Sequence, residues 1–174
     1  MIFMFVMVSG MIKIYDATAS PNANITTQAI VTGGSLSIDT QGQVNYSSVT
    51  LNAAAQNTTG NILQVNMRDP RGTGAGWSVT GLANNMQAGT NIIGNVWIRW
   101  APGDVYGLEG SSLTGVAAGP DYVGNFGDGA RTLANTSTNN GMGNYCINDS
   151  ILNLTIGAGT PAGTYQNIVA LTIS

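Results

Sequence analysis

Apolar and polar residues alternate in several short stretches of this chain. Apolar side chains occupy every second position in residues 35–39, 48–53 and 77–80, and a period of two is typical of half-buried β-strands. Less regular apolar stretches predict further strands over 25–32, 62–67, 91–101, 151–156 and 164–173. No stretch has a persuasive helical period. The pattern therefore predicts an all-β protein.

Turn signals separate these stretches about every ten residues. They are Gly33-Gly34, Gln41-Gly42, Asn57–Gly60, Pro102–Asp104 and Gly157–Gly163. Many short strands with regular turns predict a single-domain antiparallel β-sandwich over 20–174, with a barrel-like closure as the alternative. Residues 103–149 are rich in glycine and hold only short apolar pieces. We expect long Gly-rich loops and short strands there, over one end of the sheet.

The stretch Asp69–Thr80 contains the most distinctive sequence in the chain. Asp69-Pro70 ends one predicted strand, because proline lacks an amide donor and restricts the residue before it. Three glycines at alternate positions then permit tight turning, and Trp77 opens the next strand toward the core. A phosphate-binding loop is excluded, since no Lys-Ser/Thr follows the glycines and the exit is a strand.

The remaining two tryptophans lie in the predicted strand 91–101. Trp100 shares a face with Val96 and Ile98, whereas Trp97 shares the other face with Arg99. We expect either burial on both faces or one exposed aromatic residue, and Trp97 and Trp100 are the candidates for exposure.

Residues 1–19 have the features of a secretion signal. Met1–Val8 is an unbroken apolar run, and Ala17-Thr18-Ala19 fits the small residues of a cleavage site before Ser20. No basic residue precedes the apolar run, and Lys13 follows it. The run is too short and too interrupted for a stable membrane span. The alternative is a first β-strand, which subunits could exchange.

Composition favours a secreted protein without chemistry of its own. Only 7% of the 174 residues are charged, the net charge is −3 and the pI is about 4.4, so a nucleic-acid partner is not expected. The chain lacks histidine, which excludes a serine–histidine triad and the commonest metal ligand. Its only cysteine, Cys146, cannot form an intrachain disulfide, and we expect it in or near the core. No cofactor is predicted.

Acidic residues in the Gly-rich region are the remaining candidates for chemistry. Asp104, Asp121 and Asp128 lie in predicted loops, but they lack the tight alternation of a calcium site. Glu109 is the only glutamate, and Asp104 or Asp128 would have to partner it in a glycosidase. We expect solvated turn residues, with no catalytic and no metal-binding residue. Six Asn-x-Ser/Thr sequons occur, at Asn24, Asn45, Asn57, Asn135, Asn148 and Asn153.

Four sequence segments are distinctive when they are taken together. They are Ile30–Ile38, Val49–Asn52, Asp69–Thr80 with its Arg-Gly-Thr-Gly-Ala-Gly-Trp core, and Ala162–Tyr165 before the last strand. In this order and spacing they resemble the WxL-domain surface proteins of Gram-positive bacteria. The first family signature, Trp-x-Leu, falls on Trp77-Ser78-Val79 with valine in place of leucine. The second falls on Leu171-Thr172-Ile173, where leucine replaces the tryptophan.

This resemblance implies a secreted β-sandwich domain that associates non-covalently with the cell wall. It makes Trp77, Val79, Leu171 and Ile173 a candidate wall-binding motif, and burial of the same residues in the core is the competing interpretation. Exposed tryptophans would stack on glycan, while Asn and Thr side chains would bond its hydroxyls.

Two functions follow from the sequence. The first is a non-catalytic cell-surface protein whose partners are cell-wall glycan or other surface proteins. The second is a structural subunit of an extracellular filament or surface layer, a homo-oligomer that assembles by β-strand addition. If residues 1–19 are removed, Asn24–Val31 is the remaining candidate donor strand.

Overall fold

The computed structural model describes residues 25–120 and 123–174. The predicted signal segment 1–19 lies outside these residues. The chain divides into two compact units, Met1–Val31 and Thr32–Ser174, and the fold described below is that of the second. The expected strand over 25–32 is wrong, because these residues form no helix or strand.

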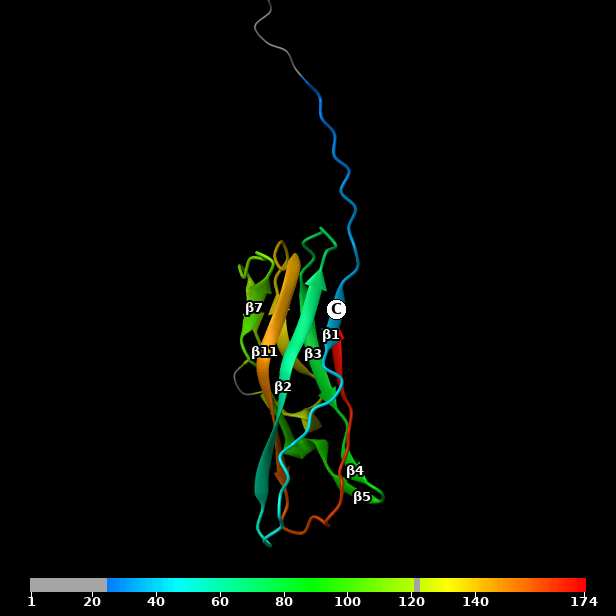
Figure 1. Ribbon diagram of the computed structural model, residues 1–174, viewed down its shortest axis with the longest axis vertical. Helices are drawn as coiled ribbons and strands as arrows, with labels where there is room; N and C mark the ends of the chain where they lie inside the picture. Colours follow the sequence, from blue (N-terminus) through cyan, green and yellow to red (C-terminus); the bar gives the residue numbers. More distant parts are fainter. Residues whose placement is uncertain (1–24, 121–122) are drawn as a thin grey trace, which may run out of the picture. The chain divides into compact units, whose positions relative to one another are not determined.

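Two antiparallel sheets make the second unit an all-β sandwich, as predicted (Figure 1). The large sheet has the order β1-β2-β11-β6-β9, with β7 also paired to β11, and the small sheet has the order β12-β3-β10-β8. The large sheet contains β1 (Ser37–Thr40), β2 (Gln56–Asp69), β6 (Ile98–Ala101), β7 (Val105–Leu108), β9 (Val123–Asn125) and β11 (Gly143–Ile156). The small sheet contains β3 (Trp77–Ala83), β8 (Val116–Ala118), β10 (Arg131–Thr136) and β12 (Val169–Ile173).

Three short elements complete the fold. A separate hairpin joins β4 (Met86–Ala88) to β5 (Asn91–Ile93), and two single 3₁₀ turns, η1 (Asn95–Trp97) and η2 (Phe126–Asp128), precede strands. The hydrophobic core draws its side chains from both sheets and from the hairpin. The two sheets therefore share one core.

The pair β2–β11 is the longest in the fold. Each strand has 14 residues, and the register runs from Gly143 opposite Asp69 to Ile156 opposite Gln56. Burial alternates along most of both strands, apart from Leu63-Gln64 on β2, which are both exposed, and Tyr145–Ile147 on β11, which are all buried. One face of the pair therefore meets the core and the other mainly faces solvent. The sequence predicted only the end of β11, from Ile151, because Gly143 and Asn144 have the composition of a loop.

Two short strands share the other side of β11. Strand β6 pairs with residues 151–154 and β7 with residues 144–147. The chain bends between them at Gly103, whose amide donates to the Ser150 hydroxyl at 3.1 Å. A Cβ at Gly103 would lie 1.6 Å from the Asn148 carbonyl oxygen, so only glycine allows this close approach.

Two further strand predictions need correction. Residues 91–101 do not form one strand, because η1 interrupts it between β5 and β6. Residues 48–53 form no strand despite their alternation: the chain over 41–55 follows β2 with isolated bonds, such as Ser47 N–H to Thr59 C=O at 3.1 Å. Alternation alone therefore did not ensure a continuous ladder of hydrogen bonds.

Candidate functional site

The Gly-rich stretch after β2 is a tight structural turn, as the sequence predicted. Gly72, Gly74 and Gly76 all have positive φ, at 70°, 61° and 78°, a region that favours glycine. A Cβ on Gly76 would also lie 2.8 Å from the Thr136 carbonyl oxygen. The turn therefore needs its glycines for conformation and for close packing against the chain after β10.

An ion pair closes this turn. Arg71 donates from Nε to Asp69 Oδ1 at 2.7 Å and from Nη2 to Asp69 Oδ2 at 2.9 Å, and Nη2 also donates to the Gly76 carbonyl at 2.6 Å. The Asp69 side chain is 1% exposed. Hydrogen bonding to Arg71 lowers the pKa of Asp69 below its ordinary 3.8, although burial opposes this shift. The guanidinium is thus engaged in holding the turn together.

Trp77 belongs to the core. Its side chain is 3% exposed, its Nε1 donates to the Gly141 carbonyl at 2.9 Å, and its ring lies 5.6 Å from that of Tyr145. Val79 is fully buried two residues later. Because the indole is enclosed on the inner face of β3, it is not placed to stack on a sugar.

The two segments that resemble the WxL signatures lie side by side. Strand β12 pairs with β3, so that Leu171 lies opposite Gly81 and Ile173 lies opposite Val79. Leu171 and Ile173 are half-buried and pack against the core. The four motif residues therefore form one core region under the small sheet, in agreement with their interpretation as core.

The two candidate exposed tryptophans differ. Trp97 in η1 is 51% exposed. Trp100, the other candidate, is not the exposed one, because it is 0% exposed and its ring meets Phe126 edge-on at 6.4 Å. The turn η1 explains the difference, because the strand begins only at Ile98. Trp100 then lies on the inward face of β6, whereas Trp97 lies in the turn and outside the core.

The loop carboxylates that the structure describes, Asp104, Glu109 and Asp128, form no shared site. Asp128 pairs with Arg131 at 2.7 Å, and Glu109 accepts a hydrogen bond from Asn144. Asp104 is exposed, and Asp121 lies outside the described residues. Within 25–120 and 123–174, no three His, Cys, Asp or Glu side chains are grouped so that they could hold a metal ion. Cys146 is a free, buried thiol.

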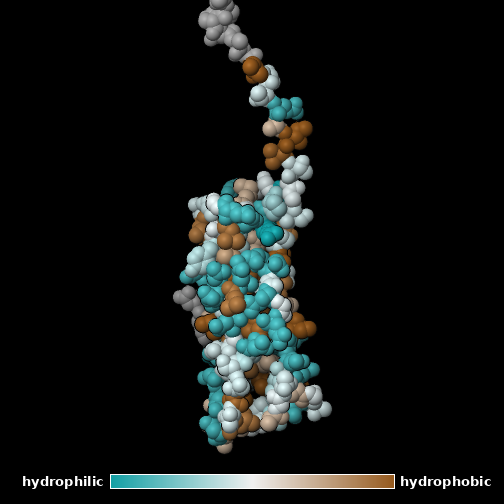
Figure 2. All heavy atoms as spheres, in the orientation of Figure 1, coloured by the Kyte–Doolittle hydropathy of each residue, from teal (hydrophilic) through white to brown (hydrophobic). Residues whose placement is uncertain are grey.

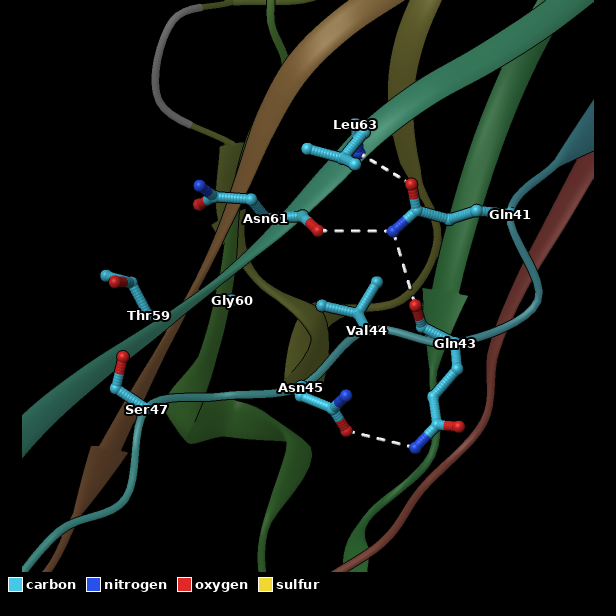
Figure 3. Close-up of a pocket in the computed structure, with 9 residues that line it drawn as sticks. All are labelled: Gln41, Gln43, Val44, Asn45, Ser47, Thr59, Gly60, Asn61 and Leu63. Carbon is cyan, nitrogen blue, oxygen red and sulfur yellow. Dashed lines mark hydrogen bonds between the residues drawn. The ribbon is translucent and has the colours of Figure 1, made fainter.

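An open cavity of about 350 Å³ lies along the edge of β2, beside the chain that follows β1 (Figure 3). Gln41 closes one end of it. Its side-chain oxygen accepts from the Leu63 amide at 3.0 Å, and its nitrogen donates to the Asn61 carbonyl at 3.4 Å. The carboxamide therefore bonds the strand edge as a peptide group of a neighbouring strand would.

The cavity is lined by uncharged side chains. Amides and hydroxyls predominate among its lining residues, which are Gln41, Gln43, Val44, Asn45, Ser47, Thr59, Gly60, Asn61 and Leu63. Gln43 donates from its side-chain nitrogen to the Asn45 side chain at 3.0 Å, and its backbone carbonyl accepts from the Gln41 side chain at 3.2 Å (Figure 3). Leu63 is 60% exposed and adds an apolar surface. Such a lining offers hydrogen-bond donors, acceptors and apolar contact, but no charge.

Apolar residues anchor the segment that carries these amides. Val44 and Tyr46 pack against the core, between the polar positions Gln43, Asn45 and Ser47. Burial raises the pKa of Tyr46 to about 12, and its buried hydroxyl has no hydrogen-bond partner among the described residues. The inward side of the segment is therefore fixed, and its outward side presents the amides.

The cavity continues into the outer face of the large sheet. On β2, Thr59 and Asn61 line the cavity and are also exposed on this face. The register places Asn153 of β11 beside Thr59, and Arg99 of β6 beside Asn153. Figure 2 shows the surface over β2 and β11 as mainly hydrophilic. We call the cavity and these outward residues the amide-rich surface.

The turn predicted at residues 41–42 does not point to this surface, although polar side chains at 43, 45 and 47 alternate with Val44 and Tyr46. That alternation was the available signal. It did not show that Gln41 would replace a strand partner, because this depends on where β1 leaves β2.

Among residues 25–120 and 123–174, the structure contains no helix with the length and hydropathy of a membrane span. A scan of the chain against protein-family models found no match, and searches of curated proteins and of solved structures found no similar protein. The relationship to WxL-domain proteins therefore stays a prediction that rests on the sequence motifs.

Proposed function

We propose that this protein is a secreted, non-catalytic cell-surface protein that binds an uncharged, N-acetylated polysaccharide of the cell envelope through its amide-rich surface. The observation that carries this proposal is the cavity at the β2 edge, which nine residues without a single charged side chain line. The low charge of the whole chain and its resemblance to cell-wall proteins agree with it.

The chemistry of the cavity favours this class of ligand. Sugar hydroxyls and acetamido groups each donate and accept hydrogen bonds, as do the side chains of Gln43, Asn45 and Asn61. An acetamido group has the same polar atoms as a peptide group, and Gln41 shows that a carboxamide here bonds peptide groups. Leu63 provides an apolar contact for a ring face.

Co-sedimentation with insoluble polysaccharide tests this function. The full chain is incubated with purified cell-wall sacculi and with chitin, an uncharged N-acetylglucosamine polymer. The double variant Gln43→Ala/Asn45→Ala removes two neutral hydrogen-bonding groups, so we expect binding to weaken about 10-fold or more. Gln87→Ala, an exposed amide on β4 away from the cavity, is the matched control.

The thermal midpoint of each variant is compared with that of the wild type, so that unfolding is not mistaken for loss of binding. Wild-type protein that stays in the supernatant with both polymers would contradict the proposal. Equal binding by the double variant would contradict the assignment of the cavity.

A second candidate function is a structural subunit of an extracellular filament or surface layer. The observation that favours it is an apolar, uncharged segment whose side chains are exposed: Ile25 is 87%, Ile30 is 85% and Val31 is 92% exposed. Exposed apolar segments with high β-propensity tend to pair with sheet edges. Growth of the native particle mass with concentration tests this candidate.

A further inference from the structure

The outer edge of β12 is open to another strand. In the order of the small sheet, β12 stands at the end, and within residues 25–120 and 123–174 its one strand pairing is with β3. Ser174 and Ser78 exchange both of their backbone hydrogen bonds, at 2.8 and 3.1 Å. Because bonded and non-bonded positions alternate in an antiparallel pair, the N–H and C=O groups of Val169, Leu171 and Ile173 point away from β3. These three residues offer a row of backbone groups.

Apolar side chains that pack against the core are only half-buried at the same place. Strand β1 ends the large sheet, and β12 lies beside it without a strand pairing (Figure 1). Most of the half-buried apolar side chains that pack against the core come from the two chain segments along this border. They are Leu36, Ile38, Val44, Tyr46, Tyr165, Val169, Leu171 and Ile173. An added strand here would bury more of an existing core.

The chain itself contains a segment of suitable chemistry. Residues 25–31 read Ile-Thr-Thr-Gln-Ala-Ile-Val, without charge, proline or glycine. Five of the seven are β-branched residues, which have high strand propensity. At about 3.3 Å per residue, seven residues reach along the whole of the five-residue β12. Ile25, Ile30 and Val31 are exposed, so their apolar side chains are available to a second copy.

We propose that residues 25–31 of one copy add as an edge strand to β12 of a second copy. The backbone groups of Val169, Leu171 and Ile173 form the new ladder, and the added apolar side chains cover the border between β1 and β12. Donor and acceptor are different surfaces, so the contact is head-to-tail and can continue from copy to copy. This inference rests on the second candidate function and is independent of polysaccharide binding.

Sedimentation velocity of the full chain over a range of concentrations is the first test. We expect the wild type to form species larger than a monomer. The donor variant Ile30→Asp/Val31→Asp should need at least about 10-fold more protein to assemble, because each charge would be placed against an apolar border. The matched control Ile92→Asp/Leu113→Asp changes two other exposed apolar residues and should assemble like the wild type.

A wild type that stays monomeric at every concentration would overturn both the inference and the subunit function. A donor variant that assembles as readily as the control would overturn the inference alone, since the copies would then meet elsewhere.

Mixed-copy disulfide formation tests the acceptor edge directly. Copies with Ala29→Cys or Ile30→Cys are mixed with copies that carry Ala170→Cys on β12 or, as control, Ala117→Cys on β8 at the opposite edge of the same sheet. Both alanines are exposed, and the native Cys146 is buried. Neighbouring strands bring Cβ atoms within disulfide reach. We expect cross-linking to position 170. Cross-linking to position 117 instead would show that the segment adds to β8, and it would overturn the choice of β12 as the acceptor.

Discussion

At the scale of single residues, the three tryptophans show how position in a strand decides what a side chain does. Trp77 and Trp100 occupy inward positions of β3 and β6 and are buried, whereas Trp97 lies in a 3₁₀ turn and is half-exposed. Trp77 also has a hydrogen-bond partner for its indole nitrogen. The residue at the centre of the WxL resemblance is therefore a stabilising core residue in this fold.

Replacement of Trp77 by alanine should be strongly destabilising. The variant loses a buried indole and leaves the Gly141 carbonyl without its partner, so we expect the free energy of unfolding to fall by about 3–5 kcal/mol. Trp97→Ala, at a half-exposed site, should change it by less than about 1 kcal/mol. Urea unfolding of the two variants provides the comparison. A loss at Trp77 no greater than at Trp97 would contradict the core assignment.

The ion pair between Asp69 and Arg71 should make stability depend on pH. Hydrogen bonding to Arg71 lowers the pKa of Asp69 in the folded protein, so the carboxylate contributes stability above its ordinary pKa of 3.8 and loses it as pH falls through the lowered value. We expect Asp69→Asn to cost about 2–3 kcal/mol at neutral pH.

Urea unfolding of this variant and the wild type at about pH 7 and about pH 2 gives the test. The difference between the two proteins should shrink at the lower pH, where Asp69 approaches its neutral form. A difference that is the same at both values would show that the charge of Asp69 is not what stabilises the turn.

At the scale of elements, β11 organises the large sheet, since β2 pairs along one side of it and β6 and β7 divide the other. The bend between β6 and β7 faces Asp149 of β11, a non-glycine residue with φ of 55°. On the other side of β11, the alternation of buried and exposed residues along β2 is interrupted at Leu63 and Gln64. The irregularities of three strands thus coincide at one level of the sheet.

Gly103→Ala should disrupt the large sheet at the bend between β6 and β7. The added methyl group would lie 1.6 Å from the Asn148 carbonyl oxygen, which is backbone and cannot move aside alone. We expect a loss of at least about 2 kcal/mol in the free energy of unfolding. Gly159→Ala is the matched control, because its methyl group would enter open space. Equal thermal midpoints for the two variants would contradict the claim that the close approach of Gly103 to β11 requires glycine.

At the scale of the whole molecule, alternation and turn signals were sufficient to predict an all-β sandwich. Trp77–Thr80 alternates and forms a real strand, because β10 and β12 flank β3 and satisfy both of its edges. Residues 48–53 alternate equally well and form no strand, because a ladder also needs a neighbouring backbone in register. Such non-local pairing is not encoded in the local pattern.

The candidate site was harder to predict than the fold. The sequence directed attention to tryptophans and carboxylates, but the amide-rich surface is built from glutamine, asparagine and threonine residues that are individually unremarkable in so polar a chain. Gln41 and Asn61 are 20 residues apart, and their proximity follows from the pairing of β1 with β2. The cavity is therefore a property of the topology.

Binding of an uncharged, N-acetylated polysaccharide to the amide-rich surface can be followed by NMR, in a titration of the isotope-labelled chain with soluble chitohexaose. Side-chain NH₂ signals of Gln41, Gln43, Asn45 and Asn61 report on the cavity itself, and those of Gln87 and Asn167 serve as remote references. We expect saturable shifts in the first group and none in the second. Shifts confined to the remote references, or no shifts at any concentration of sugar, would contradict it.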